Sequence, residues 1–124
     1  MPQKPVILVV DDDVPILVLM RSLLREFGFE PLTAATGQQA LEITRRDAPA
    51  LVLVDRHMPG MSGDDLVREL RALPREGRLP ILILSGEPVS ASELRDLDAD
   101  GAVLKPFDLG ALIGQIRGHL DGTR

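Results

Sequence analysis

The chain has no cysteine, tryptophan or tyrosine, and only three phenylalanines among its 124 residues. Without cysteine, neither a disulfide framework nor a thiolate metal site can form. The few aromatic rings argue against a flavin or an unpaired base stacked on the protein. The chain also lacks a secretion signal and any apolar run long enough to cross a bilayer. These absences favour a cytoplasmic protein with no membrane contact.

Lysine is scarce as well, with two lysines against twelve arginines, and the formal net charge is -5. A general nucleic-acid surface would be basic, so we expect no direct contact with nucleic acid. Lys105 stands out because it follows a predicted strand in a chain that otherwise uses arginine. An ammonium is a compact point charge, whereas a guanidinium is a planar fork.

Short apolar runs alternate with helix-like segments along the whole chain, and 124 residues suffice for one domain. Apolar runs of this length, separated by helices, are typical of buried parallel strands. We predict strands at residues 6–10, 29–34, 51–54, 81–84 and 102–104, and helices at 14–27, 36–48, 64–73, 90–97 and 108–120. The pattern is (βα)5, and it predicts an α/β fold with a doubly wound, five-stranded parallel sheet.

Several details of the helices can be tested. Asp13 and Thr36 are expected to cap the first two helices. The helix at 90–97 is the weakest, because only Leu94 and Leu97 can anchor it. The inner face of the first helix is expected to consist of Ile16, Met20, Leu23 and Phe27. Three glycines in the last helix, Gly110, Gly114 and Gly118, fall on one face, either as a tolerated weakness or as a flat surface for a partner.

Polar residues follow four of the predicted strands at the point where each strand ends. Asp11 and Asp12 follow the first strand, and Asp55, Ser85 and Lys105 follow the third, fourth and fifth. Ligands of open α/β sheets bind outside the carboxyl ends of the strands. The sequence therefore predicts one crevice that contains carboxylates, a hydroxyl and an ammonium.

The acidic pair points to a metal ion. Asp13 alone would cap the following helix, and two further adjacent carboxylates repel each other unless a cation balances them. Neighbouring residues of a strand point to opposite faces, so Asp11 and Asp12 reach one ion only where the strand has ended. Together with Asp55 they predict a Mg²⁺ site, because Mg²⁺ takes one or two carboxylates, keeps waters and meets a phosphate.

Asp55 is the candidate nucleophile, since a carboxylate can accept a phosphoryl group as an acyl phosphate. The alternative is a third metal ligand with no covalent role. Ser85 either caps a turn or donates to a phosphoryl oxygen. Lys105 precedes Pro106, which holds it extended, and the peptide between them can be cis or trans. A lone loop histidine such as His57 is more often neither a base nor a ligand through its side chain.

The strings ILVVDDD, LVLVDRHMPGMSG, LILSG and LKPF occur in this order and together resemble two-component response-regulator receiver domains. The resemblance covers nearly the whole chain and implies a flavodoxin-like fold. It implies that Asp11 and Asp12 are the acidic pair, Asp55 the phosphorylated residue, Ser85 the switch hydroxyl and Lys105 the phosphate-pairing lysine. It also implies that the backbone carbonyl of His57 is a ligand of Mg²⁺.

The same resemblance implies partners. The phosphoryl group would come from a sensor histidine kinase or a histidine phosphotransfer protein. A downstream protein would bind the surface of the fourth helix, fifth strand and fifth helix, and a homodimer is left open. The domain would be a switch that catalyses only its own phosphorylation and hydrolysis. We expect residues 1–124 to form a single receiver domain, with no output domain in this chain.

Two departures fall on the expected output face. The family usually carries tyrosine or phenylalanine three residues before the lysine, and here that residue is Ala102. The swing of that ring normally couples the switch hydroxyl to the surface. The segment from Ser85 to Lys105 is also about two residues shorter than is usual, which predicts a short or displaced fourth helix.

An alternative from another class is a magnesium phosphatase of the haloacid-dehalogenase type. Its nucleophile would be Asp11, with Asp13 as the acid-base. That family usually has threonine or valine two residues later, where this chain has Pro15, and the chain is short for its cap. A flavin carrier of the same topology is disfavoured, because three aspartates after the first strand would repel its phosphate.

Overall fold

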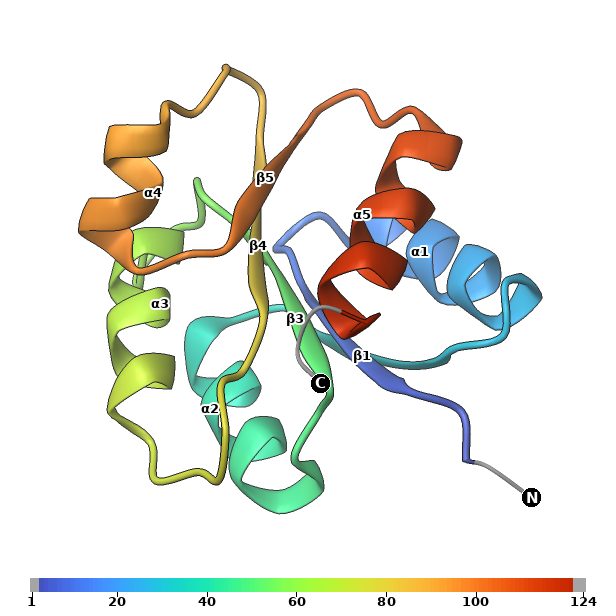
Figure 1. Ribbon diagram of the computed structural model, residues 1–124, viewed down its shortest axis with the longest axis horizontal. Coiled ribbons are helices and arrows are strands. Elements are labelled where there is room, and N and C mark those ends of the chain that lie inside the picture. The colour runs from blue at the N-terminus through green and yellow to red at the C-terminus, as the bar shows by residue number, and fades with distance from the viewer. Residues whose placement is uncertain (1–2, 122–124) are drawn as a thin grey trace.

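A computed structural model describes residues 3–121 as five parallel strands and five helices in strict alternation (Figure 1). The strand order across the sheet is β2-β1-β3-β4-β5. The elements are β1 (Val6–Val10), α1 (Val14–Glu26), β2 (Glu30–Ala34), α2 (Gly37–Asp47), β3 (Leu51–Asp55), α3 (Gly63–Ala72), β4 (Ile81–Ser85), α4 (Ala91–Leu97), β5 (Gly101–Leu104) and α5 (Leu109–Asp121). The predicted α/β class and (βα)5 order are confirmed.

Helices cover both faces of the sheet, with α1 and α5 on one side and α2, α3 and α4 on the other (Figure 1). Alternate residues of β1 pack on opposite faces of the sheet. Ile7 and Val9 pack with α1 and α5, whereas Leu8 and Val10 pack with α2 and α3. The three central strands are therefore apolar on both faces, as buried parallel strands should be.

The predicted boundaries hold to within about two residues, and the small differences matter for the site. Both β3 and β4 run one residue further than predicted, so Asp55 and Ser85 are the last residues of their strands. Asp13 and Thr36 cap their helices as expected, by accepting hydrogen bonds from Ile16 N and Gln39 N. The side chains of these two residues thus satisfy amide groups that the first helical turn leaves unpaired.

The predicted inner face of α1 is confirmed only in part. The buried side chains are Leu17, Met20 and Leu24, and Met20 alone belonged to the predicted stripe. Ile16, Leu23 and Phe27 are only partly buried. Ile16 and Phe27 pack against the edge of the core, and Ile16 and Leu23 also line an apolar groove with Phe107 and with Leu112 of α5. The apolar spacing of a leucine-rich helix does not reveal which of its residues are fully buried.

The predicted weakness of the fourth helix is confirmed. Helix α4 has seven residues, of which only Leu97 is buried. The three glycines of α5 are exposed, and a Cβ at Gly114 or Gly118 would meet nothing within 4 Å. Among residues 3–121, no helix has both the length and the apolarity that a membrane span requires.

Candidate functional site

Three carboxylates from two strands meet at the carboxyl edge of the sheet. Oxygen atoms of Asp11, Asp12 and Asp55 all lie within 4.8 Å of one another. Asp11 and Asp55 are buried, whereas Asp12 is exposed. Strands β1 and β3 are direct neighbours with Val10 opposite Val54, so the residues that follow lie side by side. The sequence had placed these residues correctly at one edge.

Lys105, the residue after β5, brings the balancing charge from two strands beyond β3 and three beyond β1. Its Nζ lies 3.1 Å from Asp11 Oδ2 and 3.2 Å from Asp55 Oδ1. The backbone at this position is held as well, because Lys105 N donates to Ser85 O over 2.7 Å. The Lys105–Pro106 peptide is cis. The Lys105 side chain is 28% exposed, so the crevice around it is open to solvent in part.

Burial and charge act in opposite directions on these groups. Burial raises the pKa of Asp11, and the nearby Asp55 carboxylate raises it further, while the Asp13 amide and Lys105 lower it without restoring the ordinary value. Burial lowers the pKa of Lys105, but the hydrogen bond and charge of Asp11 and the charge of Asp55 outweigh burial and raise it. The crevice thus favours cations, since a cation would stabilise the charged form of Asp11.

The loop after Asp55 is held close to the carboxylate. His57 N donates to Asp55 Oδ1 over 3.3 Å, while the residue itself is exposed. Gly63 begins α3 against the same segment, and a Cβ there would lie 2.3 Å from Asp55 O. Only glycine permits this close approach, so α3 starts directly beside the candidate nucleophile.

Ser85 ends β4, one residue beyond the position opposite Asp55. Its hydroxyl is buried and accepts a hydrogen bond from Glu87 N over 3.1 Å. The hydroxyl therefore anchors the start of the β4–α4 loop. Its hydrogen is still available for an acceptor at the sheet edge.

Residue 102 lies where the resemblance leads one to expect a ring. Ala102 is partly buried and packs with the apolar layer that includes Leu94 and Ala99. Its carbonyl accepts a hydrogen bond from Gln115 Nε2 over 3.0 Å. Leu104, two residues on, is 51% exposed. No aromatic side chain is present on β5 to move between two positions.

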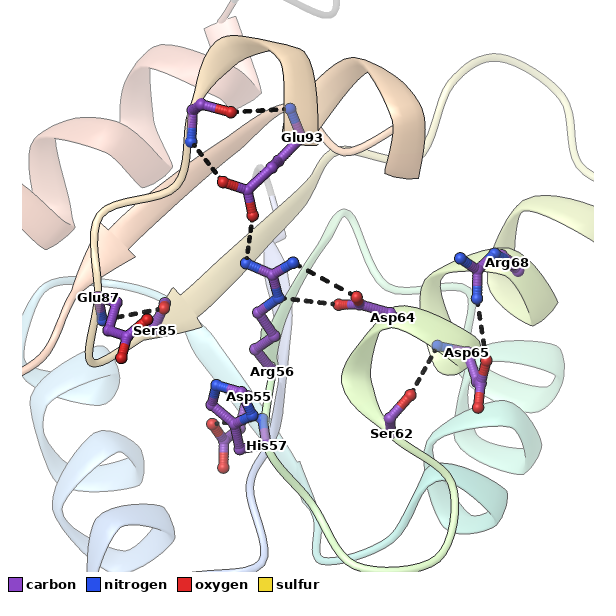
Figure 2. Close-up of polar contacts among 11 residues, drawn as sticks. Asp55, Arg56, His57, Ser62, Asp64, Asp65, Arg68, Ser85, Glu87 and Glu93 are labelled. Carbon is purple, nitrogen blue, oxygen red and sulfur yellow. Dashed lines mark hydrogen bonds and ion pairs between the residues drawn. The ribbon is translucent and has the colours of Figure 1, made fainter.

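One participant near the site was missed by the sequence reasoning. The guanidinium of Arg56, the residue after Asp55, contacts Asp64 on α3 and Glu93 on α4 (Figure 2). The alternation of side chains along a strand would have shown that Arg56 points away from the Asp55 side. It could not have identified the two acidic partners, which lie 8 and 37 residues further along the chain.

An apolar groove of about 520 Å³ adjoins the crevice on the α1 side. Its lining comes from α1, from the β5–α5 loop and from α5, namely Ile16, Leu19, Leu23, Lys105, Pro106, Phe107, Leu109 and Leu112. Val14, Val18 and Leu19 nearby on α1 are at least 50% exposed. Exposed apolar surface of this kind often marks an interaction site.

The sequence profile of the response regulator receiver domain family matches residues 7–117, and the chain belongs to that family. Sporulation initiation phosphotransferase F of Bacillus subtilis is 32% identical over 114 residues, which cover 92% of each chain. The DNA-binding response regulator MtrA of Mycolicibacterium smegmatis is 37% identical over 116 residues, covering 92% of this chain and 50% of MtrA. The chain thus spans about half the length of some relatives and nearly all of another.

Solved structures agree with this assignment. A putative response regulator from Chloroflexus aurantiacus superposes with a TM-score of 0.88 at 28% identity, over 96% of this chain and 99% of the other. A CheY-like receiver domain protein from Methanospirillum hungatei gives a TM-score of 0.87 at 28% identity, over 98% and 97% of the two chains. The predicted receiver-like, flavodoxin-type fold is confirmed.

None of these comparisons supports the haloacid-dehalogenase-type phosphatase. Asp11 Oδ1 accepts a hydrogen bond from Asp13 N, and its Oδ2 pairs with Lys105 Nζ. Asp13, which would be the acid-base of that mechanism, instead uses its carboxylate to cap α1.

Proposed function

We propose that Asp55 is the phosphoacceptor of this receiver domain and takes a phosphoryl group from a phosphohistidine. The single observation that carries the proposal is the grouping of Asp55 with Asp11, Asp12 and Lys105 at one sheet edge. An oxygen of the Asp55 carboxylate attacks phosphorus, the phosphorus–nitrogen bond breaks, and the imidazole of the donor leaves. The product is an acyl phosphate on Asp55.

Charge neutralisation is the main requirement of such a transfer, and this chain has the groups for it. Lys105 would pair with the incoming phosphoryl oxygens, since its ammonium already lies 3.2 Å from Asp55. Ser85 would donate its hydroxyl hydrogen to another phosphoryl oxygen. Both contacts are charge-assisted hydrogen bonds, the stronger kind.

The family generally uses Mg²⁺, and the residues present fit that ion. Oxygens of three carboxylates within 4.8 Å of one another form a hard, anionic donor set. Asp11, Asp12, Asp55 and the backbone carbonyl of His57 would hold the ion. When bound, Mg²⁺ neutralises the phosphoryl oxygens and relieves the repulsion among the carboxylates.

We further propose that residues 1–124 act as one receiver unit in the cytoplasm, as a switch without turnover of an external substrate. Response regulators receive phosphate from histidine kinases, and a kinase or a phosphotransfer protein is the proposed donor here. The apolar groove beside Lys105 offers such a donor a surface next to Asp55. The downstream protein would bind the surface of α4, β5 and α5, where a second copy of the chain is an alternative partner.

Incubation with Mg²⁺ and acetyl phosphate tests the proposal. Borohydride reduction followed by peptide mass spectrometry should locate the label on Asp55 alone, and Asp55→Asn should remain unlabelled. A label on Asp11 would contradict the assignment and revive the phosphatase mechanism. Absence of label in the presence of Mg²⁺, in a folded protein, would refute phosphoacceptor function.

A further inference from the structure

Arg56 connects the residue after the proposed phosphoacceptor to two helices. Its Nε lies 3.2 Å from Asp64 Oδ1 on α3, and its Nη1 lies 2.7 Å from Glu93 Oε2 on α4. Figure 2 shows the Arg56 side chain extending away from Asp55 and ending between the two carboxylates. We call these three side chains the Arg56 bridge. The Arg56 side chain is only 23% exposed, so the bridge is partly shielded from solvent.

The backbone of Arg56 is fixed to its surroundings on both sides. Arg56 N donates to Leu84 O over 3.0 Å, and Arg56 O accepts from Gly63 N over 3.0 Å. A Cβ at position 63 would lie 2.7 Å from Arg56 Cα, so the start of α3 is packed directly against this backbone. The base of the Arg56 side chain is thus tied to β4 and to the start of α3.

The other end of the bridge is the residue that organises the start of α4. Ser90 Oγ accepts from Glu93 N over 3.1 Å, and Ser90 N donates to Glu93 Oε1 over 3.3 Å, which completes a capping box. Glu93 thus binds Arg56 with one carboxylate oxygen and the N-cap with the other. The first turn of α4 takes its position from Arg56 as well as from its own cap.

The two ends of α4 are held differently. After the helix, Asp98 and Asp100 form ion pairs with Arg71 and Arg78, and Asp100 also accepts from Ile81 N over 2.9 Å. The buried side chain of α4, Leu97, is also at this end. The first turn has no fully buried residue: Leu94 packs on the apolar layer at partial burial, and Glu93 adds the polar contacts to Arg56 and Ser90.

We propose that the Arg56 bridge is a conformational latch that stabilises the unphosphorylated position of α4. The inference rests on the proposed function of Asp55. Residues 86–90 join Ser85 to the cap of α4, and Ser85 already binds this loop through Glu87 N. A phosphoryl group that recruits Ser85 would pull this loop, while the bridge holds its far end. A contact made in only one of two states favours that state.

The test is titration with beryllium fluoride, a phosphoryl mimic, in the presence of Mg²⁺. Arg56→Met and Glu93→Gln should each bind beryllium fluoride about threefold more tightly than wild type, the size expected for loss of one half-exposed ion pair. The same two variants should show faster amide hydrogen exchange in residues 91–94 of the free protein. Asp64→Asn breaks only the α3 half of the bridge, and should leave both measurements unchanged.

The opposite charges of the two variants separate a latch from simple electrostatics. Loss of a cation near an added anion should weaken binding, and loss of a carboxylate should strengthen it. Only release of the bridge makes both variants bind more tightly. Arg68→Met is the matched control, because it removes an arginine from an exposed pair with Asp65 on α3 and leaves α4 untouched.

The titration separates failure of the latch from failure of the proposed function. The latch would be overturned by affinity shifts of opposite sign in the two variants, or by shifts no larger than that of Arg68→Met. In either case, Mg²⁺-dependent binding of beryllium fluoride by the wild type would still support the proposed function. No Mg²⁺-dependent binding by the wild type would instead refute the proposed function, and the latch with it.

Discussion

The carboxyl-end crevice and the α4–β5 side belong to the same sheet, yet they are stabilised by different interactions. In the crevice, the buried Asp11 and Asp55 directly follow residues 7–10 and 51–54, which are fully inaccessible, so the packed core fixes their positions. On the other side, α4 buries one residue and β5 ends in the exposed Leu104. There, arginine–carboxylate pairs take over from apolar packing.

The proposed phosphoryl transfer therefore takes place in the rigid region, and the proposed signalling surface lies in the region held by ion pairs. A packed core resists small displacements, so the proposed phosphoryl site keeps its geometry as long as the sheet is intact. Ion pairs at partly exposed positions contribute modestly and depend on charge, so they can be broken by one new charge or one lost partner. The α4 side is therefore suited to change position in response to events in the crevice.

The largest effect is expected in the carboxyl-end crevice. Asp12→Ala should lower the rate of Mg²⁺-dependent phosphorylation by acetyl phosphate by about 100-fold, because it removes one of three carboxylates from the ion site. The fold should persist, since Asp12 is exposed. Relief of repulsion should raise the thermal midpoint in metal-free buffer by about 2 °C. Glu69→Ala, an exposed acidic residue of α3, is the control, and an unchanged rate in Asp12→Ala would remove Asp12 from the site.

The ion pairs of Asp98 and Asp100 with Arg71 and Arg78, after α4, should show the next largest effect. The size of that effect depends on pH. Burial raises the pKa of Asp100, but the hydrogen bonds from Arg78 and Ile81 N and the charges of Arg78 and Arg71 outweigh burial and lower it below 3.8. The folded-state pKa is thus below the unfolded value. The contribution of Asp100 to stability is complete above pH 3.8 and disappears as the pH falls through the folded-state value.

Asp100→Asn should therefore reduce the free energy of unfolding at pH 7 by about 2 kcal/mol, since it weakens charge-assisted hydrogen bonds at a mostly buried position. The difference from wild type should shrink in acid, below pH 3.8. Urea unfolding at several pH values measures both quantities. Asp98→Asn, at a 59% exposed side chain, should cost less. A constant difference down to the lowest pH would show that the charge of Asp100 is not the source.

The smallest and most local effect concerns the missing ring. With Ala102 on β5, activation should change amide hydrogen exchange in residues 85–89 more than in Gly101–Leu104, because no aromatic side chain links the two. Exchange with and without beryllium fluoride measures this. A partner should accordingly discriminate the two states weakly, or through the loops near the site. Strong protection confined to β5 and α5, with no change in residues 85–89, would refute the expectation.

Much of this protein follows from local sequence. The runs at 51–54 and 81–84 are apolar, bounded by polar or turn residues and too short for helices, so they indicate strands without any knowledge of the fold. Parallel strands gather their carboxyl ends at one edge, which is why Asp11, Asp55 and Lys105 could be grouped although 94 residues separate the first from the last. The caps at Asp13 and Thr36 are equally local.

Only the tertiary structure decided which partners the long side chains contact and which face of α1 is buried. Leu17 and Leu24 are buried more deeply than Ile16 and Leu23, because the packing of α1 against the sheet and α5 decides which of its apolar residues are fully covered. Arg56 reaches Glu93 because α3 and α4 both begin beside the end of β3, a placement that no spacing along the chain encodes. A strand imposes a two-residue period on its side chains, whereas an arginine has many rotamers and takes its partner from the helices packed around it.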